Sequence, residues 1–182
     1  MISGRLLGRD EIKTIWTIDR SEVITALYTL ENGALVLRPE YHNVRGWEPG
    51  KAEQVTPGFE ACYDRGGWFY GLFDHERLIG AAVLENCWIG ATADLLQLDF
   101  LHLSHGYRGR GLGKRLFMAA ATEARRRGAR RMYISATPSE HTIGFYTHLG
   151  CVLAPEPDPE LFALEPDDIH LEYALGSAML DA

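Results

Sequence analysis

The sequence predicts a mixed α/β (α+β) fold, with one sheet of about seven strands and a few flanking helices. Strand-like segments cluster early in the chain, and strand and helix patterns alternate through its middle. A length of 182 residues with 46% hydrophobic residues is sufficient for one well-filled core. Because no repeat, low-complexity segment or linker divides the chain, we expect a single domain spanning residues 1–182.

The N-terminal part predicts a helix and a hairpin. Asp10 can cap a short helix that runs toward Ile18. Residues 23–30 and 34–39 then form a strand pair, because an Asn-Gly dipeptide typical of a tight turn lies between them.

The next segment begins without a regular pattern. Residues 40–58 are rich in Gly, Pro and charge, so we expect them to be irregular, and we expect a short helix at residues 59–65 that ends at a Gly-Gly pair. Residues 68–73 and 78–85 have the pattern of a second hairpin.

The middle of the chain predicts a central strand and two helices. Residues 95–103 are mostly apolar on both faces, as in a strand that is covered on both sides. From Leu112, apolar residues recur at helical spacing until Gly128 ends the element. Residues 132–136 then predict a strand, and residues 139–149 a helix.

The C-terminal part predicts two further strands, at residues 151–154 and 169–175, with the acidic residues 155–168 as a loop between them.

Charge and composition exclude several classes of protein. A net charge of −7 and a pI near 5.5 argue against a general nucleic-acid binder, which needs a broad basic face. No signal-peptide pattern or run of about 18 apolar residues is present, so we expect no membrane partner. The chain has three cysteines, Cys62, Cys87 and Cys151. Their odd number and their lack of a paired spacing favour a reducing, cytoplasmic location.

A basic, glycine-rich stretch, HGYRGRGLGKR at residues 105–115, follows the predicted central strand. A Walker loop requires glycine where Arg108 stands, and Ser or Thr where Arg115 stands. A dinucleotide fingerprint that starts at Gly109 requires glycine where Lys114 stands. Both alternatives are therefore excluded.

The stretch does fit the pattern Arg-x-x-Gly-x-Gly, from Arg108 to Gly113, between a strand and a helix. Glycines permit positive φ and bring successive N–H groups close to an anion, and the helix N-terminus adds partial positive charge. The pattern therefore indicates a pyrophosphate site, with a glycine-rich turn that binds nothing as the alternative.

About 30 residues downstream, residues 145–151 read FYTHLGC at a predicted helix end. The two motifs together resemble the GNAT acetyltransferase superfamily, in which RxxGxG holds the coenzyme A pyrophosphate and an FYxxxGF-like segment follows. The resemblance is close over residues 68–153. It implies a mostly antiparallel sheet that is splayed at its centre, with acetyl coenzyme A (acetyl-CoA) as the cosubstrate.

The resemblance also implies how the coenzyme is bound. The strand edge at Leu101, His102 and Leu103 hydrogen-bonds the pantetheine arm through backbone groups that the splayed sheet leaves unpaired. The pyrophosphate is bound by the backbone amides of Arg108, Gly109, Arg110, Gly111, Leu112, Gly113 and Lys114.

Tyr146 corresponds to the tyrosine that protonates the departing thiolate in many family members. A phenol with a pKa near 10 is mostly protonated at neutral pH, so it can act as a general acid. The alternative is an aromatic side chain that only packs on its helix.

The general base is less clearly indicated. Asp99 stands where the family often carries an acidic residue, on an otherwise apolar strand, and burial of a carboxylate raises its pKa. A structural aspartate is an open alternative. Glu85, His102 and His141 are weaker candidates, and a chain of water molecules could replace them all.

Ser139 stands where the family commonly has asparagine. Serine can still cap the helix, and a contact to the coenzyme follows only from the resemblance. No cluster of His, Cys and carboxylates has metal-site spacing, so we expect no metal.

The acceptor is expected to be a small-molecule amine or a peptide amine. The segment 156–172 has seven carboxylates and no Lys or Arg, so it would attract a cationic acceptor unless it is only a solvated loop. Several aromatic residues either line an acceptor cleft or pack in the core: Trp47, Tyr63, Trp68, Phe69 and Tyr70.

Two classes of function remain. The first is an N-acetyltransferase that works by direct attack in a ternary complex, since no cysteine adjoins a base that would favour a covalent intermediate. The second is a sensor or partner module that binds an acyl-CoA without catalysis. Tyr146 and Asp99 together favour the first class. Many members of the family dimerise, so a homodimer is compatible with either.

Overall fold

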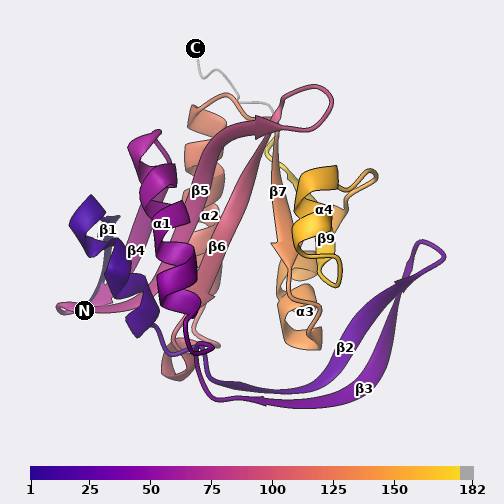
Figure 1. Ribbon diagram of the computed structural model, residues 1–182, viewed down its shortest axis with the longest axis horizontal. Helices are drawn as coiled ribbons and strands as arrows, with labels where there is room; N and C mark the ends of the chain where they lie inside the picture. The colour runs from indigo at the N-terminus through magenta and orange to yellow at the C-terminus, as the bar shows by residue number, and fades with distance from the viewer. Residues whose placement is uncertain (177–182) are drawn as a thin grey trace. The chain divides into compact units, whose positions relative to one another are not determined.

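The computed structural model describes residues 1–176, which belong to two compact units (Figure 1). The first unit contains residues 1–22, 44–87 and 98–122. The second contains residues 23–43 and 88–97 and the chain from residue 123 onward. Neither unit is a continuous stretch of chain.

Seven of the strands form one sheet, and two form a separate ribbon. In spatial order, the strands of the sheet are β1 (Ile2–Leu6), β4 (Trp68–Asp74), β5 (Arg77–Ile89), β6 (Leu95–Leu103), β7 (Arg131–Ala136), β9 (Ile169–Ala174) and β8 (Val152–Leu153). The β6–β7 pair is parallel, whereas β1–β4, β4–β5, β7–β9 and β8–β9 are antiparallel. The prediction of a mixed, mostly antiparallel sheet of about seven strands is confirmed.

Strands β6 and β7 pair over only a short stretch. Leu95–Gln97 pair with Arg131–Tyr133, after which β6 continues to Leu103 and β7 to Ala136. The pairing therefore covers only the first part of each strand.

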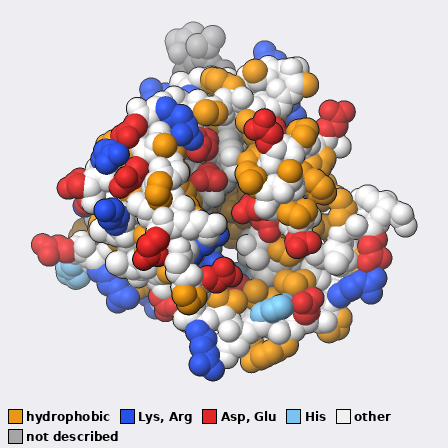
Figure 2. All heavy atoms as spheres, in the orientation of Figure 1, with side chains coloured by type: hydrophobic (Ala, Val, Ile, Leu, Met, Phe, Trp, Pro, Cys, Tyr) orange, Lys and Arg blue, Asp and Glu red, His pale blue; other side chains and the backbone are white. Residues whose placement is uncertain are grey.

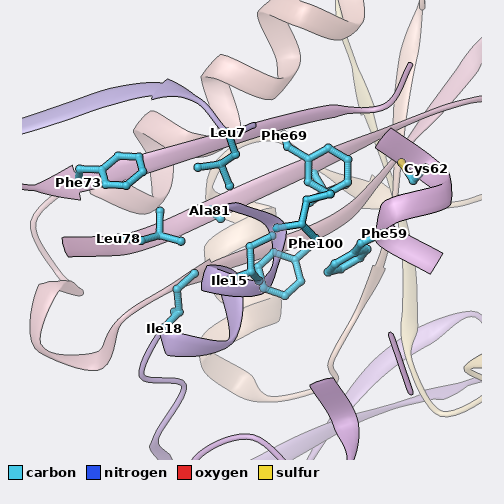
Figure 3. Close-up of a cluster of buried hydrophobic side chains, with 12 residues drawn as sticks. Leu7, Ile15, Ile18, Phe59, Cys62, Phe69, Phe73, Leu78, Ala81 and Phe100 are labelled. Atoms are coloured by element: carbon cyan, nitrogen blue, oxygen red, sulfur yellow. The ribbon is translucent and has the colours of Figure 1, made fainter. Parts of the chain in front are cut away.

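The first unit has helices on both faces of its strands. The 3₁₀ helix η1 (Arg9–Thr17) and helix α1 (Lys51–Asp64) cover one face, where their apolar side chains pack against Phe69, Phe100 and other residues of the strands (Figure 3). Helix α2 (Leu112–Arg126) lies behind β5 and β6 in Figure 1, with Leu116 beside Gly80. The loop before α2 therefore follows a strand that is covered on both sides.

The second unit contains β7, β8 and β9, the helices α3 (Glu140–His148) and α4 (Pro159–Leu164), and nearly all of the β2 (Glu22–Glu31) and β3 (Ala34–Val44) ribbon. A buried chain of hydrogen bonds fixes its acidic segment. The Asp158 N–H donates to the Tyr133 hydroxyl at 2.9 Å, and that hydroxyl lies 2.8 Å from His170 Nδ1.

Two elements arise where residues 40–58 were expected to be irregular, so that prediction is wrong. Strand β3 continues to Val44, and α1 begins at Lys51, before the expected helix start at residue 59. Phe59 and Cys62 are buried on this helix. Pro57 inside the helix concealed its apolar face in the sequence, because proline usually ends a helix.

Other differences occur at ends and edges. The first helix begins after Gly8, not after Asp10, and Glu11 accepts a hydrogen bond from the Gly8 N–H at 2.8 Å. The edge strand β1 was not predicted. In the acidic segment expected to be a loop, Asp158 caps helix α4, accepting from the N–H groups of residues 160 and 161 at 3.1 Å.

Several predicted features are confirmed by backbone geometry. The first hairpin turns at Asn32 (φ 50°) and Gly33 (φ 80°), although it forms a ribbon apart from the main sheet. The second hairpin and the helix that ends before Gly128 also form as expected.

Alanine should change the free energy of unfolding in opposite directions at two glycines, one inside α1 and one in the turn that follows it. At Gly58 an added Cβ meets nothing within 4 Å, so Gly58→Ala should stabilise the protein by roughly 1 kcal/mol through helix propensity. At Gly67 the Cβ would lie 2.2 Å from Cys62 Sγ and 2.8 Å from the Cys62 carbonyl oxygen. Gly67→Ala should therefore lower the free energy of unfolding by about 1–3 kcal/mol. Urea denaturation of both variants checks the opposite signs.

Candidate coenzyme site and catalytic residues

The glycine-rich loop connects the end of β6 to the start of α2. After the 3₁₀ turn η2 (His105–Tyr107), Gly109 and Gly111 have φ of 74° and 76°. A Cβ at either position would meet nothing within 4 Å, so these glycines are required by backbone conformation and not by lack of space.

The loop presents backbone N–H groups to an anion. The Arg115 N–H donates to the Gly111 carbonyl at 3.0 Å, which is the first backbone hydrogen bond of α2. The amides of Leu112, Gly113 and Lys114 precede it in the first turn, where N–H groups have no acceptor within the helix. Together with the positive end of the helix dipole, these donors can bind a phosphate group.

Arg108 differs from the rest of the loop, because its groups are engaged within the protein. Its N–H donates to the His105 carbonyl at 3.2 Å. Its guanidinium donates to the Leu103 carbonyl at 3.1 Å and to the Glu22 carboxylate at 2.6 Å. The side chain therefore fixes the loop to the last residue of β6. Sequence reasoning missed Glu22, which lies 86 residues away.

The Arg108–Glu22 ion pair gives a stability prediction. Both side chains are 22% exposed, so removal of one leaves a partly buried partner without its counter-charge. Arg108→Gln should lower the free energy of unfolding by about 1–3 kcal/mol, whereas Arg110→Gln, at an exposed position of the same loop, should change it by less than about 0.5 kcal/mol. Urea denaturation compares the two, and equal values would contradict the anchoring role.

The predicted strand edge lies in the first unit. Leu101 and His102 are half-buried and Leu103 is buried. The His102 ring lies 5.0 Å from the ring of Trp47 and 4.7 Å from that of Phe100. Burial, followed by the positive charges of nearby arginines, lowers the pKa of His102 to about 3, so its imidazole is neutral at physiological pH.

The candidate bases are placed differently from expectation. Asp99 is exposed, so the expectation of a buried carboxylate is wrong, and its candidacy depends on its position on β6 alone. Glu85 pairs with Arg65 at 2.7 Å, and His141 is exposed. The alternation of residues placed Asp99 on the same face of an otherwise apolar strand as Gln97 and Leu101, without showing which face met solvent.

Tyr146 and Ser139 lie in the second unit, on α3 and at its start. Tyr146 is 6% exposed, and burial together with the adjacent Cys151 thiol raises the pKa of its phenol well above the ordinary value. Ser139 accepts from the Thr142 N–H at 3.2 Å, so the predicted cap is confirmed, and its hydroxyl donates to Thr142 Oγ1 at 2.9 Å.

The structure thus gathers most of the predicted site residues in the first unit: Asp99, the β6 edge and the glycine-rich loop. Tyr146 and Ser139 belong to the second unit. Within residues 1–176, no group of three or more His, Cys, Asp or Glu side chains has the arrangement of a metal site. Over the same residues, no helix combines the length and apolar character required to cross a membrane.

The aromatic residues of the N-terminal half divide into two sets. Phe69 is buried in the core of the first unit, and Trp47 and Tyr63 pack against that core. Trp68 and Tyr70 stack on each other, with ring centroids 5.2 Å apart.

On the face drawn in Figure 2, Lys and Arg side chains are interspersed with Asp and Glu.

Comparison with known families identifies the fold. The model of the acetyltransferase (GNAT) family matches residues 25–151, which is most of the chain. The chain belongs to the GNAT acetyltransferase family. The N-acetyltransferase YjgM of Escherichia coli (strain K12), itself uncharacterized, is 27% identical over 116 residues. That match covers 63% of this chain and 59% of the relative, so the chain spans less than two thirds of the relative's length.

Solved GNAT structures share this architecture. A nourseothricin acetyltransferase has a TM-score of 0.69 at 17% identity, with 96% of this chain and 99% of that chain covered. A Bacillus anthracis str. Ames protein, crystallised with acetyl coenzyme A, has a TM-score of 0.62 at 19% identity, with 94% and 95% covered. At these identities the likeness shows a shared GNAT fold.

Proposed function

We propose that the protein is an acetyl-CoA-dependent N-acetyltransferase that moves an acetyl group to a primary amine by direct attack in a ternary complex. The observation that carries this proposal is the loop at the start of α2, where two glycines at positive φ precede helix amides that have no acceptor within the helix. Membership of the GNAT family and the acetyl-CoA bound to the B. anthracis structure support it.

In this proposal the coenzyme is bound mainly by backbone groups. The amides of residues 109–114 hold the pyrophosphate, and the edge of β6 at residues 101–103 pairs with the amides of the pantetheine arm, as an added strand would. Arg108 is a positioning residue, because its guanidinium fixes the loop to β6. Ser139 adds a contact to the coenzyme, and its hydroxyl can donate to the coenzyme only after it stops donating to Thr142 Oγ1.

The acceptor is an ammonium ion at neutral pH, so it first loses one proton to water. The neutral nitrogen then attacks the thioester carbonyl, so a C–N bond forms and the C–S bond breaks. A second proton leaves the nitrogen for Asp99, directly or through water, and the Tyr146 phenol gives its proton to the departing thiolate and regains one from solvent. Because the pKa of Tyr146 is raised by burial, the phenol carries that proton throughout the physiological pH range.

The acceptor is a small-molecule amine or a peptide amine, and we propose that the two units act together as one domain spanning residues 1–182. A homodimer is compatible with this scheme. The competing function is a sensor or partner module that binds an acyl-CoA without transfer. It is less favoured, because Tyr146 and Asp99 together would supply the acid and the base that transfer requires and binding alone does not.

Two measurements, made one after the other, test the proposal. Calorimetry with acetyl-CoA should show binding, and a panel of amines should then release free coenzyme A thiol when mixed with enzyme and acetyl-CoA. Binding without thiol release on any amine would favour the non-catalytic module. No binding of acetyl-CoA would overturn both functions.

A further inference from the structure

Arg20 is a half-buried arginine without a polar partner. The described residues contain four other half-buried arginines, and each is engaged: Arg108, Arg127 and Arg131 with carboxylates, and Arg125 with the Leu175 carbonyl. Arg20 makes no ion pair or hydrogen bond with any residue from 1 to 176. A guanidinium with no acceptor in the protein keeps all of its N–H groups available for a ligand.

The carboxylates nearest in sequence are committed elsewhere. Asp19 accepts a hydrogen bond from the Ser21 N–H at 2.9 Å. Glu22 pairs with Arg108 at 2.6 Å, so those two charges cancel. Arg20 is therefore not paired with either carboxylate, and its guanidinium N–H groups are available to an acceptor from outside the chain.

Trp47 gives Arg20 a rigid platform. The Arg20 guanidinium carbon lies 5.0 Å from the Trp47 ring centroid. The indole N–H of Trp47 donates to the Ile18 carbonyl at 2.8 Å, and its ring packs edge-on against Trp16 at 5.0 Å. A guanidinium beside an aromatic ring keeps N–H groups available for a planar, bidentate acceptor such as a carboxylate.

His102 adds a neutral polar group beside this platform. Its ring packs edge-on against Trp47 at 5.0 Å, and Arg20 is one of the charges that act on it. The ring nitrogens make no hydrogen bond with the described residues, and no fully buried side-chain nitrogen or oxygen there lacks a partner. The nitrogens are therefore open to solvent or to a ligand, and a neutral imidazole does not repel an ammonium group.

We propose that Arg20, Trp47 and His102 form a carboxylate-binding subsite for the acceptor, so that the substrate is an amino acid or another amine that carries a carboxylate. The inference rests on the proposed function and names its substrate class. His102 lies on β6 between Leu101 and Leu103, the strand edge proposed for the pantetheine arm, so the subsite adjoins the coenzyme. A single guanidinium, with its parallel N–H donors, matches the two oxygens of a carboxylate.

The subsite points to a different acceptor class from the cationic acceptor that the acidic segment suggested. The acidic segment at residues 156–172 was a reason to expect a cationic acceptor. Two of its carboxylates are engaged within the protein, since Glu172 pairs with Arg131 at 2.7 Å and Asp158 caps α4. The Arg20 guanidinium favours a carboxylate-bearing amine, whereas the other carboxylates of the segment would favour a polyamine, so the diamine in the test below distinguishes the two classes.

Matched sets of amines test the inference. L-phenylalanine, L-phenylalaninamide and phenethylamine form one set, and analogous sets are built on other side chains, with a diamine and an aminoalkyl phosphate added. For the sets that are turned over, kcat/KM should be at least about tenfold higher for the carboxylate member. Arg20→Gln should remove that preference, Arg20→Lys should retain part of it, and Arg45→Gln, an exposed arginine of the same loop as Trp47, should leave it unchanged.

The possible failures are distinguishable. Turnover with equal kcat/KM for acid and amide, or with preference for the diamine or the phosphate, overturns the subsite and leaves the proposed function standing. If no amine is turned over, calorimetry with N-acetyl amino acids in the presence of coenzyme A tests whether the subsite binds a carboxylate. Binding that Arg20→Gln weakens about tenfold or more supports the subsite, and absent or unaffected binding overturns it. Circular dichroism and the Tm confirm that each variant is folded.

Discussion

Gly111→Val is expected to weaken acetyl-CoA binding by about a hundredfold or more. Gly111 has φ of 76°, a region that costs an L-residue roughly 1–2 kcal/mol and a β-branched residue more. Valine should draw the backbone out of this region and turn the first amides of α2 away from the pyrophosphate. Loss of two hydrogen bonds to a charged group, at about 1.5–3 kcal/mol each, corresponds to at least a hundredfold in Kd.

A matched pair of alanine variants separates conformation from bulk. Gly106 lies in the same stretch but does not have positive φ, and an added Cβ at either glycine meets nothing within 4 Å. Calorimetry should therefore show weaker binding for Gly111→Ala and unchanged binding for Gly106→Ala. If Gly111→Val is folded by its Tm and binds acetyl-CoA like the wild type, the loop is not the pyrophosphate site.

The sequence predicted best those elements whose signals are local. The Asn-Gly turn of the first hairpin, the Ser139 cap and the glycine-rich loop all depend on residues within a few positions of one another. Helix α4 also has a local signal in Asp158 followed by proline, but the acidic composition around it was interpreted as a loop. Strand β1 is short and mostly exposed, so its sequence has little apolar pattern to reveal it.

The site shows the same division between local and distant information. Motif spacing indicated the amides that we propose bind the coenzyme, because they are consecutive in the chain. It could not indicate that Glu22 holds Arg108, or that Trp47 contacts both Arg20 and His102, because folding alone brings these residues together. Period-two alternation showed which residues share a face of β6, but not which face meets solvent.

Tyr146→Phe is expected to lower kcat by about a hundredfold to ten-thousandfold while leaving the Kd for acetyl-CoA unchanged. The substitution removes one hydroxyl from a buried ring, so the thiolate must leave without a proton donor. Tyr41→Phe, at a tyrosine that is 68% exposed on β3, is the matched control and should retain full activity.

The pH dependence of kcat provides a second test of the same acid. Burial raises the pKa of Tyr146 above its ordinary value near 10, so the active, protonated form persists as the pH rises. The wild type should therefore show no loss of kcat from ionisation of this phenol between pH 7 and about 10. Stopped-flow measurement of thiol release across this range checks the profile. A variant Tyr146→Phe with the kcat of the wild type would remove the acid role and leave direct departure of the thiolate as the mechanism.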